Sequence, residues 1–83
     1  SLEQTIQVFP NPARDEVQVS FGQLLQGRAT LELRSLQGAL LMQKEADGLT
    51  GAHTLRVSSL PKGIYLLQVR TAAGTVTRRL AVQ

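Results

Sequence analysis

The stretch IYLLQVRTAAGTVTRRLAV, residues 64–82, predicts two antiparallel β-strands joined by a tight turn. Apolar residues fall at alternate positions on both sides of TAAGT, which is typical of strands with one face on a core and the other in water. They are Tyr65, Leu67 and Val69 in the first strand, and Val76, Leu80 and Val82 in the second. Gly74 suits the turn, because glycine adopts the positive φ angles that short hairpin connections need.

The same alternation extends over the rest of the chain, so we predict an all-β protein. Turn signals, most of them containing glycine, separate the apolar segments at short, even intervals. Seven strands are predicted, near residues 4–9, 16–22, 28–36, 39–46, 53–58, 63–71 and 75–82. Short strands between such turns are typical of an antiparallel β-sandwich.

Residues 38–46, GALLMQKEA, are the one stretch for which a helix competes, because these residue types have good helix propensity. The stretch is short and directly follows a hairpin-like turn, so we predict a strand. FGQLLQGR at residues 21–28 is predicted as a turn. DGLTGAH at residues 47–53 is predicted as a loop, since it has two glycines and little apolar content.

The composition predicts one domain, 1–83, and argues against several classes of protein. A chain of 83 residues suffices for one domain but not for two. It has no cysteine, so neither a disulfide nor a zinc–thiolate site can form. The net charge is +3, but the sequence has no tract of basic residues with interleaved aromatic residues. This argues against nucleic-acid binding. No apolar run approaches the roughly 20 residues of a membrane-spanning segment.

No residue set typical of an enzyme, a cofactor site or a metal site is recognisable. His53 is the only histidine, and no acidic residue lies at a typical ligand spacing from it. No serine lies in a G-x-S-x-G elbow, and GQLLQG lacks the ending of a phosphate-binding loop. Most acidic residues fall at solvent-facing strand positions or in turns. We therefore predict no catalytic residue, no cofactor and no metal.

The segment VFPNPARDEV, residues 8–17, predicts a rigid corner between the first two strands. Pro10 and Pro12 have no backbone N–H and cannot pair as strand residues do. Asn11 and Asp15 have side chains that commonly bond nearby backbone donors in turns. These residues are therefore predicted to shape the corner, and direct contact with a partner is the alternative.

A second turn, LPKG at residues 60–63, is predicted to lead into the sixth strand. Pro61 and Gly63 suit a tight turn, and Tyr65 then points inward by alternation. A buried tyrosine needs a hydrogen-bond partner for its hydroxyl, and in β-sandwiches nearby backbone often supplies it.

The last strand carries a charge on its apolar face, since Arg78 shares the alternation of Leu80 and Val82. Such a charge must lie at a sheet edge, at a bulge or beside an acid. One interpretation is that Arg78 protects an edge strand from pairing with another chain. The other is that this strand, with Arg79 and a terminal carboxylate at Gln83, forms a recognition element.

Three segments, in this order, resemble the type A C-terminal sorting domain of type IX (Por) secretion substrates. They are VFPNPARDEVQVSF at residues 8–21, LELRSLQGALLM at 31–42 and VSSLPKGIYLLQVRTAAGTVTRRLAVQ at 57–83. They span most of the chain, and the ordered set is more specific than any single motif. The chain departs from the family where Ser35 replaces the usual aspartate and Leu80 a common aromatic. Ala39 stands where a basic residue often follows the hairpin glycine, and arginines replace the usual lysines.

The resemblance implies a seven-stranded antiparallel Ig-like β-sandwich at the end of a larger secreted precursor. Implied partners are an outer-membrane type IX translocon, a barrel shuttle protein and a sortase-like cysteine protease, which removes the domain and joins the cargo to lipopolysaccharide. The cargo passes through the periplasm to the outer membrane, the cell surface or the medium. The sorting-motif residues, expected to form structural corners, are Pro10, Asn11, Pro12, Asp15, Gly38, Leu60, Pro61, Gly63 and Tyr65. The candidate translocon-recognition residues are Arg78, Arg79, Leu80, Val82 and Gln83.

An accessory carbohydrate- or protein-binding module of a secreted enzyme is the alternative function, because sandwich folds host many activities. Sugar sites usually present exposed aromatics, whereas Phe9, Phe21 and Tyr65 are all expected to have core or corner roles. The sequence leaves open the cargo, the cleavage site, the removal of the domain and the oligomeric state.

Overall fold

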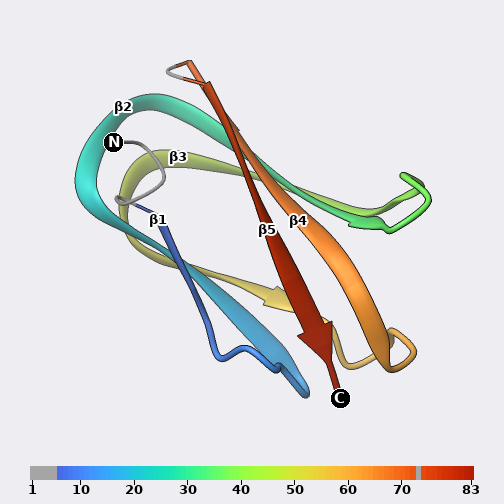
Figure 1. Cartoon of the computed structure of the whole chain (residues 1–83). Helices are drawn as coiled ribbons and strands as arrows, with labels where there is room; N and C mark the ends of the chain where they lie inside the picture. The colour runs from blue at the N-terminus through green and yellow to red at the C-terminus, as the bar shows by residue number, and fades with distance from the viewer. Residues whose placement is uncertain (1–5, 73) are drawn as a thin grey trace.

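The described part of the chain consists of five β-strands and contains no helix (Figure 1). The computed structural model describes residues 6–72 and 74–83, and their side chains except at 21–27 and 47–52. The strands are β1 (Ile6–Phe9), β2 (Glu16–Ser35), β3 (Leu40–Arg56), β4 (Gly63–Thr71) and β5 (Gly74–Val82). The pairings between these strands are antiparallel, and the all-β prediction is confirmed.

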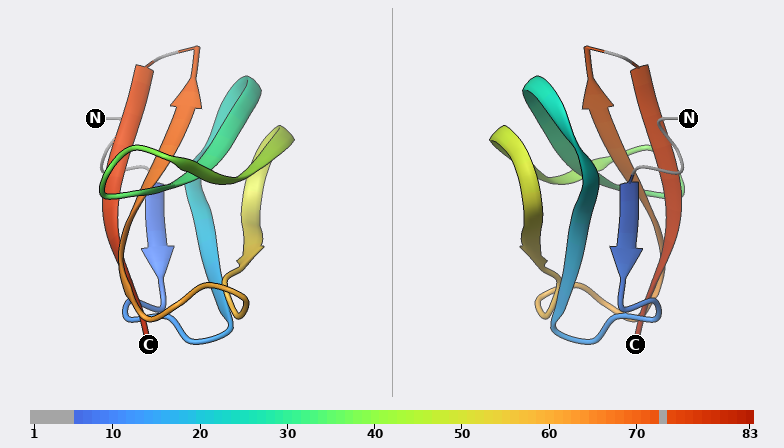
Figure 2. Two further views of the ribbon diagram at one scale, coloured as in Figure 1. Left: turned by 90° about the vertical axis from the view of Figure 1, so that its right-hand side faces the viewer. Right: turned by 90° about the vertical axis from the view of Figure 1, so that its left-hand side faces the viewer.

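Two long strands, β2 and β3, each run through both layers of the sandwich (Figure 2). In one layer, residues 16–21 of β2 lie between β1 and residues 51–56 of β3. In the other layer, residues 28–35 of β2 lie between the first part of β3 and β4, and β5 pairs with the far side of β4. Seven strand segments are therefore present as predicted, since β2 and β3 each supply two, and the Ig-like sandwich is confirmed.

Bends within β2 and β3 replace two of the predicted connections. The segment 21–28, predicted as a turn, and the segment 47–53, predicted as a loop, are both strand. They lie side by side, with Phe21 opposite Gly51, and the register shifts twice between Phe21 and Arg28. The turn and loop predictions were wrong because glycines that signal a turn also suit a β-bulge, which bends a strand without ending it.

The two predicted hairpin turns are confirmed. Gly38, between β2 and β3, has a φ of 96°, and Gly74, at the start of β5, has a φ of 142°. Ser35 Oγ accepts a hydrogen bond from the Ala39 N–H at 3.1 Å, so serine supplies the turn-stabilising oxygen that an aspartate could also supply. The segment with helix propensity is a strand, since β3 begins at Leu40.

The core lies between the two layers and is almost entirely aliphatic. Its buried side chains come from the inner faces of the strands and from the corner: Ile6, Ala13, Val17, Val19, Ala29, Leu31, Leu33, Ala46, Leu55, Val57, Tyr65, Leu67, Val69, Val76, Leu80 and Val82. The alternation predicted for β4 and β5 is thus the observed alternation of burial. Among the described residues, no helix is long and apolar enough to cross a membrane.

Candidate functional site

The corner, the LPKG turn and the end of the last strand meet at one end of the sandwich. Gly63, at the start of β4, lies opposite Val82, at the end of β5. Ala13 in the corner forms a parallel bridge with Val82. The Val57 N–H donates to the Asp15 carbonyl at 2.8 Å, which ties the corner to the segment before the LPKG turn. The three motifs therefore build one continuous surface, which we call the motif end.

Asn11 pairs with β5 as though it were a residue of a neighbouring strand. Its Oδ1 accepts a hydrogen bond from the Ala81 N–H at 3.0 Å, and its Nδ2 donates to the Arg79 carbonyl at 3.0 Å. A side-chain amide offers the same donor and acceptor as a peptide group. We expected Asn11 to bond backbone close to it in sequence; the structure shows bonds to a strand 68 and 70 residues away.

Ala13 continues this pairing toward the end of the strand. Its N–H donates to the Ala81 carbonyl at 2.8 Å, and its own carbonyl accepts from the Gln83 N–H at 2.8 Å. Exposed strand edges are prone to pair with other chains unless something covers them. Asn11 and Ala13, which we call the corner clamp, cover the outer edge of β5 from Arg79 to its end and also bond Gln83, the residue that follows it.

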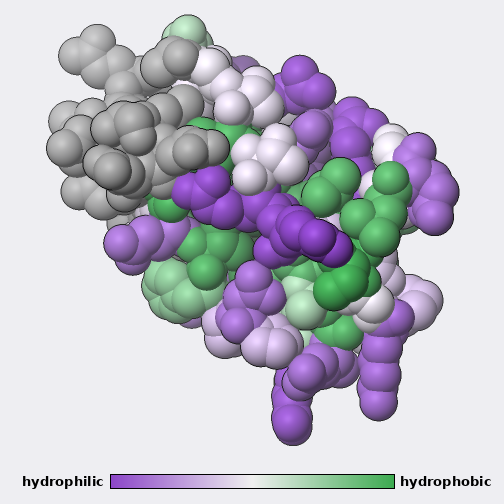
Figure 3. All heavy atoms as spheres, viewed as in Figure 1, coloured by the Kyte–Doolittle hydropathy of each residue, from purple (hydrophilic) through white to green (hydrophobic). Residues whose placement is uncertain are grey.

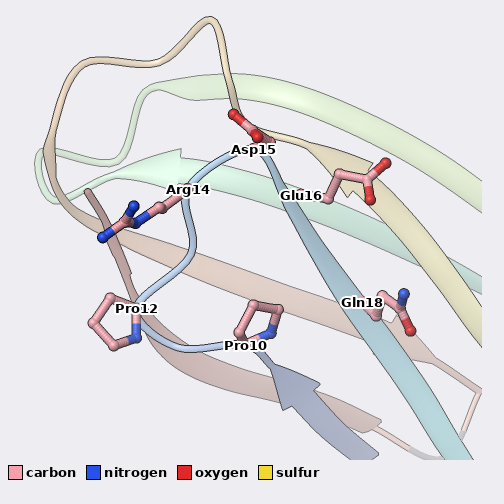
Figure 4. Close-up of a pocket in the computed structure, with 6 residues that line it drawn as sticks. All are labelled: Pro10, Pro12, Arg14, Asp15, Glu16 and Gln18. Carbon is pink, nitrogen blue, oxygen red and sulfur yellow. The ribbon is translucent and has the colours of Figure 1, made fainter.

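The prolines and Asp15 shape the corner around the clamp. Pro10 and Pro12 flank Asn11, and both peptide bonds that precede them are cis. Their exposed rings line an open cavity of about 420 Å³ together with Arg14, Asp15, Glu16 and Gln18 (Figure 4). The Asp15 side chain is exposed and makes no hydrogen bond within the described residues, so Asp15 contributes to the corner through its carbonyl.

The LPKG turn is held by Tyr65, as the sequence predicted. The Tyr65 ring is buried, and its hydroxyl donates to the Pro61 carbonyl at 2.5 Å. Leu60 packs against the core, and its N–H donates to the Val57 carbonyl at 3.0 Å. The turn is thus fixed on both sides before Gly63 begins β4.

The predicted recognition residues divide into buried and accessible ones. Leu80 and Val82 are 0% and 4% exposed, whereas Arg79 and Gln83 are exposed. Arg78 is half-buried on the inner face, as its alternation predicted, and its Nη2 donates to the Ile6 carbonyl at 3.4 Å. Arg78 therefore lies on an edge strand, and its side chain reaches from β5 to β1. A sheet edge is one of the three positions predicted for such a charge.

Glu32 is a buried acid that two arginines hold on the outer face of the second layer. Arg70 Nε and Arg34 Nη2 lie 3.1 and 3.2 Å from Glu32 Oε1. These bonds, the one from Arg70 above all, lower the pKa of the Glu32 carboxyl below its usual value, although burial opposes them. Because Glu32 and Arg70 link β2 to β4, we assign this cluster a structural role. In the part of the chain that the structure describes, no group of three acidic or histidine side chains is placed to hold a metal.

Three residues of the motif end were missed by sequence reasoning. Ala13 carried no signal, since a small apolar residue in a turn predicts no partner. Arg14 and Lys62 are exposed cations that line a second cavity, of about 580 Å³, with Gln83. Their proximity depends on the corner and the LPKG turn being brought together, which residue spacing alone does not show.

A comparison with known proteins shows which family the sequence matches. A family model described as a secretion system C-terminal sorting domain matches residues 7–83. The matched range includes the corner, both hairpins, the LPKG turn and all of β5. The search of curated proteins returned no match.

Proposed function

Because the chain belongs to the family of secretion-system C-terminal sorting domains, we propose that the type IX translocon recognises its folded motif end. Membership of this family indicates that the chain is a C-terminal type IX sorting signal. The proposal adds that the signal is a three-dimensional surface of the sandwich and is not a linear peptide.

The proposed route begins in the periplasm. There the domain directs its cargo to the outer-membrane translocon, with a barrel shuttle protein as a further partner. A sortase-like cysteine protease then removes the domain, and the cargo is attached to the cell surface. These steps follow from the family resemblance, and the sequence motifs that carry it support them.

The observation that supports a folded signal is the corner clamp. Asn11 and Ala13 bond backbone groups of Arg79, Ala81 and Gln83, which lie within the stretch 78–83 that the sequence predicted as the recognition element. The motif nearest the start of the chain thus fixes the position of the last strand. A partner that binds this end meets both motifs together.

The proposal also distinguishes the residues that a partner contacts from the residues that hold the last strand and the turns in position. In the folded domain a partner can contact Arg79 and Gln83 freely and Arg78 in part. Leu80 and Val82 face the core, so they contribute by holding the strand in place. The prolines and Tyr65 set the shape of the surrounding turns.

A reporter fusion in a host with type IX secretion tests this function. Residues 1–83 are fused to the C-terminus of a periplasmic reporter, beside a fusion that lacks residues 78–83 and one with Asp15→Ala. We expect export of the complete fusion and retention of the truncated one in the periplasm. Asp15→Ala should be exported nearly as well as the complete domain, because that side chain is exposed and makes no hydrogen bond within the described residues.

Cell fractionation and surface proteolysis measure the outcome. A complete fusion that stays in the periplasm with its domain intact would show that the chain is not a sufficient signal. Equal export of the complete and truncated fusions would contradict recognition through the last strand. Loss of the domain from the exported reporter, abolished in a host without the protease, would support the cleavage step.

A further inference from the structure

The positive charges of the chain fall into two groups according to their partners. All nine lysines and arginines belong to the described residues, and six of them bond an acid or a carbonyl. These six are Arg28 with Glu45, Arg34 and Arg70 with Glu32, Arg56 with Glu16, Lys44 with the Thr54 carbonyl, and Arg78 with the Ile6 carbonyl. The side chains of Arg14, Lys62 and Arg79 make no such contact in the described part of the molecule.

The three cations that have no partner among the described residues all belong to segments of the motif end. Arg14 lies in the corner, Lys62 in the LPKG turn, and Arg79 in β5 where its carbonyl bonds the clamp. All three are exposed. Figure 3 shows strongly hydrophilic side chains that project from the end of the molecule where the C-terminus lies in Figure 1. The unneutralised positive charge is therefore concentrated where the motifs meet.

No acidic side chain lines the hollow that Arg14 and Lys62 border, although Gln83, which also lines it, carries the terminal carboxylate named above. The cavity of about 580 Å³ is lined by these two cations and by Gln83. The neighbouring acid, Asp15, does not neutralise it: Figure 4 shows the Asp15 carboxylate and the Arg14 guanidinium leaving the corner in different directions. Glu16 lies with Arg56, 3.7 Å away. Two cations from separate turns thus face one solvent-filled space.

We propose that the motif end docks against an acidic surface of a protein of the export machinery, with Arg14 and Lys62 receiving carboxylates in this hollow. This inference rests on the proposed function and adds the chemistry of the partner. Complementary charge of this kind speeds encounter and fixes register between two proteins. It also gives the corner and the LPKG turn a direct part in recognition beside β5.

An acidic protein fits this surface better than a membrane does. Segments that bind anionic lipid electrostatically typically carry clusters of about four to eight lysines and arginines. The motif end offers three from three segments, and two of them, Arg14 and Lys62, line a concave site. A concave site with two cations matches protruding aspartate or glutamate side chains, whereas a lipid surface is flat on this scale.

The test compares two double variants in the reporter fusion. Arg14→Gln with Lys62→Gln removes two charges from the hollow and leaves β5 unchanged. Arg28→Gln with Arg56→Gln is the matched control, because it removes two exposed charges elsewhere, each from a surface ion pair of little energetic weight. We expect the first variant to lose about fivefold to tenfold in export rate and the control to stay within about twofold of the unaltered domain.

Two further measurements separate recognition from folding. Arg14→Lys with Lys62→Arg keeps both charges and should restore export. The thermal midpoint of Arg14→Gln with Lys62→Gln should match that of the unaltered domain, since neither side chain bonds an acid or a carbonyl in the part of the chain that the structure describes. A lowered midpoint that accounts for the export defect would overturn the inference.

Other outcomes decide between the proposed function and this inference. Export of the unaltered domain with equal export of Arg14→Gln, Lys62→Gln would overturn the inference alone. Failure of the unaltered domain to export would overturn the proposed function and the inference with it. Sedimentation of the domain with vesicles of phosphatidylglycerol and phosphatidylcholine, lost in Arg14→Gln, Lys62→Gln, would identify a membrane as the partner and overturn the assignment to a protein.

Discussion

Asn11 does with one side chain what a neighbouring strand does with its backbone. Its amide bonds the Ala81 N–H and the Arg79 carbonyl, both at 3.0 Å. A strand edge covered in this way needs no further strand beside it, so the corner can turn away immediately toward β2. The flanking prolines fit this arrangement, because they offer no N–H of their own to compete for the same carbonyls.

Two substitutions at Asn11 test separately the contributions of its side-chain donor and its side-chain acceptor. Asn11→Ala removes both bonds, and Asn11→Asp keeps an oxygen for the Ala81 N–H while it places a second oxygen against the Arg79 carbonyl. We expect each to lower the free energy of unfolding by about 1–2 kcal/mol, measured by urea denaturation. Hydrogen exchange at the Ala81 amide should accelerate in Asn11→Ala and much less in Asn11→Asp. Unchanged exchange in Asn11→Ala would show that the clamp does not protect this amide.

At the motif end, some contacts of single residues could be predicted from the sequence and others could not. The sequence indicated that the Tyr65 hydroxyl bonds nearby backbone, because this partner is local and recurs in sandwiches. It did not indicate the partners of Asn11, because a side-chain amide satisfies a turn or a distant strand equally well. Arg14 and Lys62 gave no signal, since exposed cations are common and their proximity arises only on folding.

At the scale of strands, the sequence predicted which residues face the core better than it predicted where strands end. Alternation in β4 and β5 gave the buried residues, because the pleat fixes a period of two. The sequence predicts a turn and a loop where β2 and β3 bend between the layers, because bulges and turns use similar glycine-rich sequences. The alternation predicted on either side of the bend in β2 is nevertheless observed, with Val17 and Val19 buried before it and Leu31 and Leu33 buried after it.

Glu32 ties β2 to β4, and this link makes stability depend on pH. Its pKa is lowered in the folded state, chiefly by the hydrogen bond from Arg70. A lowered folded-state pKa stabilises the fold above the unfolded value, near 4.5, and this contribution is lost as pH falls through the folded value. We therefore expect Glu32→Gln to be less stable than the unaltered domain at neutral pH.

Urea denaturation across a pH series measures this contribution. The difference between Glu32→Gln and the unaltered domain should shrink as pH falls below the ordinary glutamate range. Glu45→Gln is a suitable control, because Glu45 lies on the surface with Arg28 at 3.5 Å and both side chains are largely exposed. A difference that stays constant through the acidic range would contradict an ionised Glu32 held by the two arginines.

For the whole molecule, the central question is whether export depends on the stability of the sandwich or on the last strand in particular. Leu80 of β5 and Leu67 of β4 are both 0% exposed and belong to the same core. Replacing either with alanine should cost about 2–5 kcal/mol. A small domain has only about 5–15 kcal/mol in total, so both variants approach the limit of folding.

Leu80→Ala and Leu67→Ala should therefore reduce export in proportion to their loss of stability, measured by urea denaturation and reporter export side by side. We expect the two variants to fall on one common relation, because Leu80 faces the core and supports β5 without meeting a partner. Leu33→Ala, also at 0% exposure but on β2, provides a third point for this relation. If Leu80→Ala lost far more export than its stability explains, the partner would have to read the inner face of β5. Recognition would then require the last strand to leave the sandwich, because the corner clamp and the core otherwise hold that face out of reach.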